Sequence, residues 1–154
     1  MDLTLKKGTD DLIWEDVLKI FSNKQDIMKS EKTELACNKI KTAFLNSYVV
    51  LSAWFGNEMV GFCRALSDGV RQSVIYDLNV KENHRNKGIG KTLMTNIVDN
   101  LPNGPIILYA IPGKEIYYQN LGFKKLLTGM ALFPDVDNRK SLGFIGLCLV
   151  KCAS

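Results

Sequence analysis

The sequence has few of the side chains that metal sites and thiol chemistry require. It has one histidine, His84, and four cysteines, Cys37, Cys63, Cys148 and Cys152. The last two are spaced C-x-x-x-C and the others are isolated, so no metal-ligand pattern is present and we expect no metal site. Free thiols in a reducing compartment are the simpler interpretation. A Cys–His nucleophilic pair through His84 stays open, although nothing near any cysteine indicates an activated thiol.

The sequence also lacks a long hydrophobic run and a strong charge of either sign. Residues 142–150 form the longest late apolar stretch, which is short and contains glycines, so we expect no membrane span. The first residues carry charge early, unlike a signal peptide, and we expect a cytoplasmic location. A net charge of +4 suits an anionic ligand and is too small to indicate nucleic-acid binding.

No repeat, low-complexity tract or interdomain linker divides the sequence. Its 154 residues are 46% hydrophobic and 23% charged, which is ordinary for a globular protein. This length is enough for one domain with a substantial core. We therefore predict a single domain over residues 1–154.

A strand followed by a helix is predicted within residues 74–101. Residues 74–80, VIYDLNV, are rich in the β-branched and aromatic side chains of buried strands. From Ile89 to Leu101, apolar residues recur with the spacing of one helix face, and a Pro- and Gly-containing segment follows. The polar residues between the strand and the helix must therefore form a connecting loop.

This loop combines glycines with positive charge at the start of the predicted helix. Gly88 and Gly90 allow a tight turn with accessible backbone N–H groups. Arg85, Lys87 and Lys91 flank them. Because the free amides and the dipole of a helix N-terminus both favour negative charge, we expect a phosphate or pyrophosphate to bind here.

Three phosphate-binding motifs share parts of this loop. Gly90, Lys91 and Thr92 match the end of a Walker A loop, but Arg85 stands where that loop needs a glycine. Gly88 and Gly90 supply two glycines of G-x-G-x-x-G, and the third is missing. The pattern Arg-x-x-Gly-x-Gly is met in full. A helix-capping loop in an unrelated α/β protein is the structural alternative.

Two motifs together resemble a known family. Arg85, Gly88 and Gly90 follow the predicted strand, and residues 117–123, YYQNLGF, resemble Phe-Tyr-x-x-x-Gly-Phe with Tyr117 in the first position. With a strand predicted at residues 106–110 between them, the sequence resembles the GCN5-related N-acetyltransferases. The resemblance implies an α/β (α+β) fold with a mixed, mostly antiparallel central sheet and helices on both faces.

The remaining elements are predicted from pattern and turn residues. A helix after Asp10 or Asp11 has Ile13 on its apolar side, and a second helix buries Leu35. A polar linker at residues 24–30 separates these helices. The second helix is predicted at about 32–45. The other predicted elements are strands at 3–6, 48–55, 59–66, 123–126, 129–133 and 142–151, and a short helix with Pro112 in its first turn that ends near Asn120.

The resemblance implies that the protein binds acetyl-CoA as co-substrate. In the family the loop amides hold the pyrophosphate, and the preceding strand carries a bulge, splays from its neighbour and pairs with the pantetheine arm. A backbone N–H of Asn79 or Val80 would stabilise the oxyanion. The residues that match the cofactor site are Leu78, Asn79, Val80, Arg85, Asn86, Lys87, Gly88, Ile89, Gly90, Lys91 and Tyr118.

Two residues are the catalytic candidates. Tyr118 matches the family position that protonates the departing sulfur, and the alternative is that Tyr117 and Tyr118 only pack in an amphipathic helix. Asp77 is a carboxylate in an otherwise apolar strand, so it could accept the amine proton or bind the positive charge of the acceptor. A structural ion pair with Arg64 or Arg71 is the competing interpretation of Asp77.

We therefore predict direct transfer of an acetyl group to an amine of unknown identity, first a small primary amine. A protein amino group or an antibiotic-like amine is the second choice of acceptor. A CoA-binding sensor or structural module without turnover, and a phosphoryl transferase, are the alternatives from other classes. We expect no nucleic-acid or membrane partner, and residues 142–150 could pair in a homodimer.

Overall fold

The computed structural model describes residues 2–22 and 33–146. The chain falls into two compact units, Met1–Leu108 and Tyr109–Ser154, and each is described by itself. The expectation of one domain over the whole chain stays a prediction. The polar linker predicted at 24–30 lies outside the described residues.

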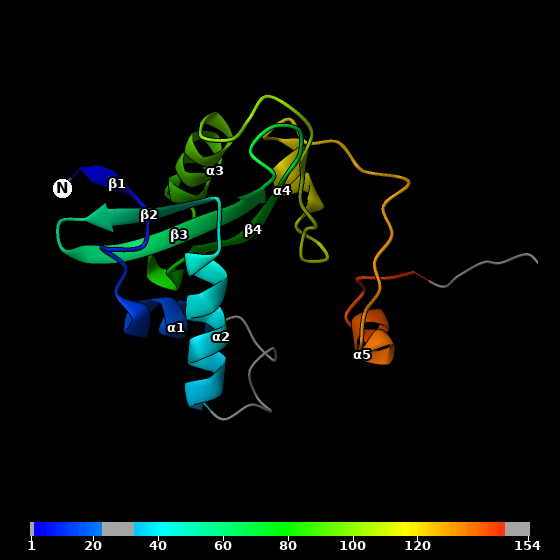
Figure 1. Ribbon diagram of the computed structural model, residues 1–154, viewed down its shortest axis with the longest axis horizontal. Coiled ribbons are helices and arrows are strands. Elements are labelled where there is room, and N and C mark those ends of the chain that lie inside the picture. Colours follow the sequence, from blue (N-terminus) through cyan, green and yellow to red (C-terminus); the bar gives the residue numbers. More distant parts are fainter. Residues whose placement is uncertain (1, 23–32, 147–154) are drawn as a thin grey trace, which may run out of the picture. The chain divides into compact units, whose positions relative to one another are not determined.

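The first unit contains a five-stranded sheet in the order β1-β2-β3-β4-β5 (Figure 1). The strands are β1 (Leu3–Lys7), β2 (Val49–Phe55), β3 (Glu58–Ser67), β4 (Ser73–Val80) and β5 (Ile106–Ile107). The first four are antiparallel neighbours and β5 runs parallel to β4. The predicted mixed, mostly antiparallel sheet is confirmed.

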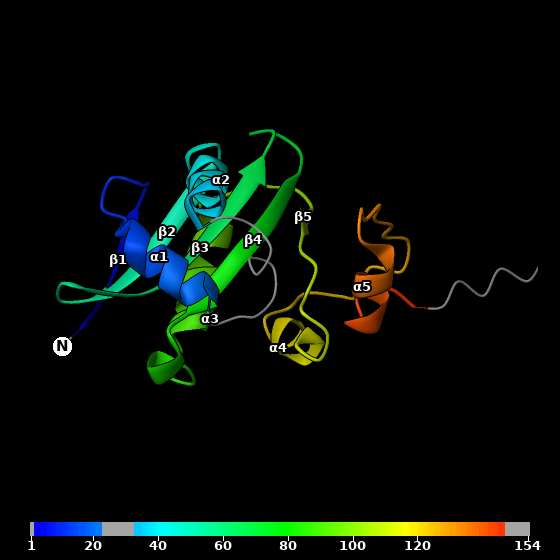
Figure 2. The same ribbon diagram turned by 90° about the horizontal axis from the view of Figure 1, so that it is seen from below.

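Helices cover both faces of this sheet, as predicted (Figures 1 and 2). They are α1 (Trp14–Ser22), α2 (Thr33–Leu45) and α3 (Ile89–Asp99), with a short 3₁₀ turn, η1 (Glu82–His84), before α3. Helices α1 and α2 lie on one face, and α3 lies on the other. No helix of the described residues has the length and apolar character needed to cross a membrane.

Aromatic side chains form the core between the sheet and the helices α1 and α2. The ring of Phe62 on β3 lies 5.4 Å from those of Phe21 on α1 and Phe44 on α2. Phe44 and Phe62 are almost completely buried, and burial of such side chains is the main source of stability. This core therefore holds α1 and α2 against the face of the sheet on which Phe62 lies.

The opposite face is packed against the helical stripe predicted from the sequence. Ile89, Leu93, Met94 and Ile97 are buried along α3. A Cβ added to Gly61 on β3 would lie 3.3 Å from the Leu93 side chain, so the two elements pack closely. The sheet thus holds the N-terminal end of α3 beside the end of β4.

Two side chains predicted to be buried in the first unit are exposed. Leu35 is 53% exposed, because the buried and half-buried side chains of α2 are Ala36, Cys37, Ile40, Ala43 and Phe44, and Leu35 lies outside this stripe. Ile13 is 38% exposed and precedes the first residue of α1. Both predictions were wrong because the first residue of each helix was not known, and the side of the helix on which an apolar residue lies depends on it.

The second unit differs most from its prediction. Its helices are α4 (Glu115–Gln119) and α5 (Val136–Ser141), and α5 was not predicted. Pro112 lies before α4 rather than in its first turn. Residues 123–126 and 129–133 are not strands, nor are 142–146, and the rest of that last predicted strand lies outside the described residues. A segment with high strand propensity forms a strand only where a neighbouring strand pairs with it. The sequence pattern does not show whether such a neighbour is present.

The strand predicted at 106–110 is also shorter than expected. Only Ile106 and Ile107 pair with β4, opposite Ser73 and Val74. The ladder between β4 and β5 therefore stops well before the end of β4.

Candidate functional site

The loop between β4 and α3 has the conformation of an exposed turn. Asn86 and Gly88 both have positive φ, 62° and 81°. Gly88 is the N-cap of α3, and its carbonyl accepts hydrogen bonds from the N–H and Oγ1 of Thr92 at 3.0 and 3.2 Å. A left-handed N-cap favours glycine because a Cβ is strained there. The structure thus explains Gly88 by the backbone itself.

The amides at the start of α3 face no acceptor among the described residues. No described residue lies within 4 Å of a Cβ built on Gly88. Among residues 2–22 and 33–146, the N–H groups of residues 87–91 have no acceptor, as expected for the first turn of a helix. Lys87 and Lys91 are exposed and have no carboxylate partner in the described part of the chain. The turn is therefore open to a ligand.

Arg85 closes the base of the loop. Its Nε donates to the carbonyl of Val80 at 3.4 Å, and Nη1 lies 3.7 Å from Oε1 of Glu82. The side chain thus connects the end of β4 with η1 while 41% of it stays exposed. An anion at the loop would meet a guanidinium whose charge Glu82 only partly offsets.

His84 and Lys81 hold η1 against the sheet. The His84 ring lies 5.5 Å from that of Phe55, and its Nε2 lies 3.5 Å from Glu58. Lys81 Nζ lies 3.4 Å from both Asp16 and Glu58. The His84 ring is therefore packed beside the turn.

These features fit a diphosphate. Open amides at a helix N-terminus, a left-handed glycine with free space before it and exposed basic side chains are what anionic phosphates bind. Residues 85–91 could therefore hold the pyrophosphate of a nucleotide-like molecule.

The strand before this loop carries a bulge at Asp77. The pairing of β3 with β4 shifts between Phe62 and Arg64, which face Asn79 and Tyr76. Two residues of β4 therefore lie opposite one residue of β3, and Asp77 takes a φ of 53°. Together with the short ladder to β5, this bulge matches the irregular strand that the family resemblance implies.

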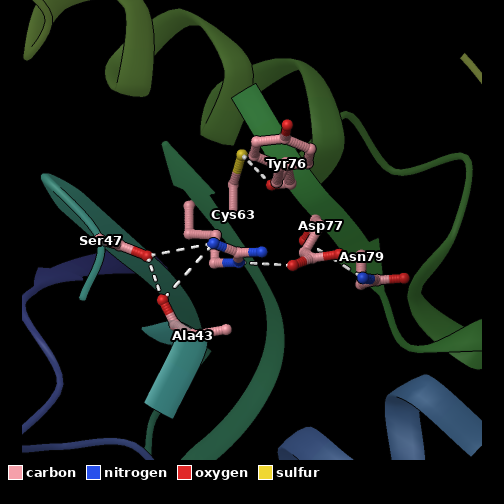
Figure 3. A network of polar contacts seen from close by, with 7 residues as sticks. Ala43, Ser47, Cys63, Tyr76, Asp77 and Asn79 are labelled. Carbon is pink, nitrogen blue, oxygen red and sulfur yellow. Dashed lines mark hydrogen bonds and ion pairs between the residues drawn. The ribbon is translucent and has the colours of Figure 1, made fainter. Parts of the chain in front are cut away.

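Asp77 pairs with Arg64 across the two strands (Figure 3). Nε of Arg64 donates to Oδ2 of Asp77. Nη1 of Arg64 lies 3.4 Å from the carbonyl of Ala43 and from Oγ of Ser47, and its guanidinium lies 5.1 Å from the Tyr76 ring. The ion pair with Arg64 considered from the sequence is thus present. A catalytic role for Asp77 stays a prediction.

The other carboxylate oxygen remains available. Asp77 Oδ1 has no hydrogen-bond donor within the described ranges, and 27% of the side chain is exposed. Arg64 therefore neutralises and orients the carboxylate while leaving one oxygen for another donor.

Cys63 lies opposite the bulge and is not an activated thiol. It is completely buried, and its Sγ lies 3.7 Å from the carbonyl of Tyr76. Burial, with a smaller contribution from the Asp77 charge, strongly raises the pKa of the Cys63 thiol. Among the residues described, no group of three His, Cys, Asp or Glu side chains could hold a metal ion.

Tyr118 lies on α4, in the second unit. Its ring contacts that of Tyr117 edge-on at 5.1 Å and that of Phe123 at 6.2 Å. Gly122 has a φ of 95°, and the N–H of Phe123 donates to the Tyr118 carbonyl at 3.1 Å. The YYQNLGF motif is therefore one compact turn in which Gly122 folds Phe123 back onto Tyr118.

The side chain of Asn79 is a feature that the sequence prediction missed. Only its backbone was assigned a role, yet the side chain is buried and its Oδ1 has no partner among the described residues. The available signal was a polar residue in an apolar strand.

Comparison with known families and proteins gives consistent results. The model of the family described as Acetyltransferase (GNAT) family matches residues 13–123. The chain is 33% identical over 92 residues to the uncharacterized N-acetyltransferase ycf52 of Gracilaria tenuistipitata var. liui, covering 55% of this chain and 50% of that protein. It is 30% identical over 115 residues to the histone acetyltransferase TAP1 of Glycine max, covering 64% and 50%. The chain spans about half the length of these curated relatives.

Solved structures share the fold. An acetyltransferase of the GNAT family from Streptococcus pneumoniae TIGR4 matches with a TM-score of 0.70 and 25% identity, over 86% of this chain and 98% of that one. Glucosamine-6-phosphate N-acetyltransferase from Arabidopsis thaliana matches with a TM-score of 0.63 and 12% identity, over 88% and 100%.

Proposed function

The chain belongs to the acetyltransferase (GNAT) family, and on that premise we propose that it moves the acetyl group of acetyl-CoA directly to an amine. The observation that carries this proposal is the open first turn of α3, where Gly88 is left-handed with no described residue near its missing Cβ. A packed turn would have no room for a pyrophosphate.

Acetyl-CoA, when bound, supplies an activated thioester. Residues 85–91 hold its pyrophosphate through backbone N–H groups and positive charge. The backbone of Leu78, Asn79 and Val80 binds the pantetheine arm and polarises the thioester carbonyl. The bulge at Asp77 and the early end of the β4–β5 ladder support this assignment.

Three side chains carry the proton transfers. Asp77 receives the proton of the acceptor ammonium on the oxygen that Arg64 leaves open. Arg64 keeps the carboxylate oriented through its Nε. Tyr118 donates its phenolic proton to the departing thiolate. Because the amine attacks the thioester directly, no cysteine is needed, which suits the buried Cys63.

A small primary amine is the proposed acceptor, and a protein amino group is the second candidate. The first is supported by the named activity of a relative, serotonin N-acetyltransferase 2 of Oryza sativa subsp. japonica, 34% identical over 80 residues. The second is supported by the name of the Glycine max relative. A cytoplasmic location and a homodimer stay predictions.

Two measurements test this function. Acetyl-CoA binding is measured by calorimetry, and thiol release is followed with a panel of primary amines. Binding with amine-dependent release supports the proposal. Binding without release from any amine or lysine peptide supports the non-catalytic CoA-binding alternative. Absence of acetyl-CoA binding contradicts both.

A pair of glycine variants locates the cofactor. Gly88→Val should weaken acetyl-CoA binding by at least about tenfold, because a side chain would occupy the space before the amides. Gly8→Val is the matched control, since Gly8 also has positive φ, 102°, and no described residue near its missing Cβ. Equal loss of affinity in both variants would contradict the assigned site.

A further inference from the structure

The side-chain oxygen of Asn79 is a buried acceptor without a donor. Asn79 is 3% exposed, and within residues 2–22 and 33–146 nothing donates to its Oδ1. Buried polar side-chain atoms are nearly always hydrogen-bonded, because an unmet one loses its hydration without compensation. An atom that breaks this rule beside a candidate site indicates a ligand.

The orientation of the Asn79 amide is fixed. Its Nδ2 donates to the backbone carbonyl of Asp77 at 3.1 Å, and only the nitrogen can donate to a carbonyl. The oxygen therefore cannot exchange places with the nitrogen. Figure 3 shows the Asn79 nitrogen facing Asp77 and the Asn79 oxygen pointing away from Asp77. Oδ1 can only be satisfied by an incoming N–H or O–H.

Asn79 lies on the face covered by α1 and α2. Residues directly opposite each other in antiparallel strands share a face, and Asn79 is opposite Phe62. Phe62 is buried in the aromatic core, with the Phe21 ring at 5.4 Å. The acceptor oxygens of Asn79 and Asp77 thus belong to the same end of β4, where Asp77 is paired with Arg64 and Asn79 lies opposite the aromatic core.

We propose that Asn79 Oδ1 accepts a hydrogen bond from the attacking nitrogen and thereby selects primary amines over N-methylated ones. This inference rests on the proposed function. In the reaction the N–C bond forms, the C–S bond breaks and the sulfur gains a proton from Tyr118. Asp77 receives the first proton of the ammonium and releases it to solvent, and the second proton leaves toward Asp77 after the attack and restores the Tyr118 phenol through solvent. A primary ammonium loses two protons and keeps one N–H in the product amide, whereas an N-methylated ammonium keeps none.

Only the primary amine can therefore keep Asn79 satisfied throughout the transfer. With an N-methylated amine, the last N–H leaves toward Asp77 and Asn79 Oδ1 is again buried without a donor. A site built to hydrogen-bond a substrate group discriminates strongly against an analogue that lacks it. Asn79 is thus a specificity-determining residue that contacts the substrate.

The test compares 2-phenylethylamine with N-methyl-2-phenylethylamine, because the nearby core is aromatic. The kcat/KM of each is measured by thiol release at saturating acetyl-CoA, for the parent protein and for Asn79→Leu, which has nearly the same shape. Loss of a hydrogen bond to a charged group lowers kcat/KM for the primary amine by about tenfold to a hundredfold. The preference for the primary amine should fall by the same factor.

Controls separate recognition from folding. In Asn79→Leu the Tm should stay within about 4 °C of the parent, since the variant loses one donor and also an unmet acceptor. Acetyl-CoA affinity should be unchanged because the backbone N–H remains. Asn96→Leu is the matched control: its Nδ2 also donates to a backbone carbonyl, that of Thr92 at 2.9 Å, on α3. It should keep the parent preference.

A measurement on the parent protein keeps the proposal testable if Asn79→Leu does not fold. N-acetyl-2-phenylethylamine retains an N–H and should inhibit at least about tenfold better than its N-methyl derivative. Equal inhibition, or an unchanged preference in folded Asn79→Leu, overturns the inference alone. Absence of turnover with every primary amine overturns the proposed function and the inference with it.

Discussion

The two units of the molecule treat their apolar side chains in opposite ways. In the first unit most large apolar residues of the sheet and of α3 are buried or half-buried, and Phe44 and Phe62 meet between the sheet and α2. In the second unit Leu127, Met130 and Leu132 are 85%, 99% and 99% exposed. The first unit therefore contains its own core, and the second depends little on apolar burial.

The proposed functional residues divide along the same boundary. The loop of residues 85–91, Asp77 and Asn79 lie in the first unit, and Tyr118 lies in the second. Cofactor binding and recognition of the acceptor are thus attached to a packed core, while the proposed general acid is carried by a short helix. Acetyl-CoA binding and proton donation should therefore be separable by mutation.

The largest expected effect concerns the core. Phe62→Ala should lower the free energy of unfolding by about 3–5 kcal/mol, because a large cavity opens among aromatic rings. Leu132→Ala, in the second unit, should change it by less than about 0.5 kcal/mol. Thermal and urea unfolding measure both. A comparable loss in Leu132→Ala would show that this side chain is buried in solution and would break the comparison.

The next effect separates binding from chemistry. Tyr118→Phe should lower kcat by about a hundredfold to ten-thousandfold, as expected for loss of a general acid. Acetyl-CoA affinity should stay within about twofold, because the pyrophosphate is held by residues of the first unit. Tyr117→Phe is the neighbouring control and should keep activity. If Tyr118→Phe weakens acetyl-CoA binding as much as it slows turnover, the proposed division between the units is wrong.

A smaller effect is expected at the ion pair. Arg64→Met removes the donor that orients Asp77 and leaves the carboxylate without a partner, so stability should fall by about 1–3 kcal/mol. KM for the amine should rise more than KM for acetyl-CoA. Steady-state kinetics and thermal unfolding measure these changes, with exposed Arg71→Met as control. Equal rises in both KM values would assign Arg64 a purely structural role.

The smallest effect is a pH dependence in each unit. Backbone N–H groups of Arg71, Val70 and Gln72 lower the pKa of Asp68, and hydrogen bonds from Asn138 and then Arg139 lower that of Asp135. A carboxylate with a lowered folded pKa stabilises the fold above its unfolded pKa, and this contribution disappears as the pH falls through the folded value.

Asp68→Asn should therefore lower Tm at pH 7 and leave it unchanged at a pH below both pKa values. Asp135→Asn should show the same dependence in the helicity of α5, with little effect on the melting of the first unit. Circular dichroism at the two pH values measures both variants. A loss of Tm that persists in acid would mean that Asp68 acts through its shape rather than its charge.

Residues 74–101 show how far local pattern can predict structure. The apolar stripe from Ile89, the left-handed position of Gly88 and the preceding strand depend on neighbours in sequence, and all three are present. The strands predicted within residues 123–133 are absent because a strand also needs a partner strand, and local sequence pattern does not reveal whether one is adjacent. The prediction for Leu35 was wrong because adjacent residues of a helix point in different directions, so Ala36 is buried while Leu35 is exposed.

The site was predictable at the level of the loop and less so at the level of side chains. The exposed turn, the bulge and Tyr118 lie on the elements that the resemblance implies, and their roles stay predictions. It could not show that Asp77 is already paired with Arg64, since that depends on the register between two strands. Nor could it show that the Asn79 amide is oriented by the carbonyl of Asp77 and that its oxygen has no donor among the described residues.

The left-handed backbone at Asp77 and Asn86 has a consequence for divergence among relatives of this chain. Asn86 is exposed, and asparagine, aspartate and glycine tolerate its conformation, so this position can exchange among these residues. Asp77 cannot change alone to a residue without a carboxylate, because the guanidinium of Arg64 would then lose its partner. Positions 64 and 77 should therefore change together across an alignment, while position 86 alternates among Asn, Asp and Gly.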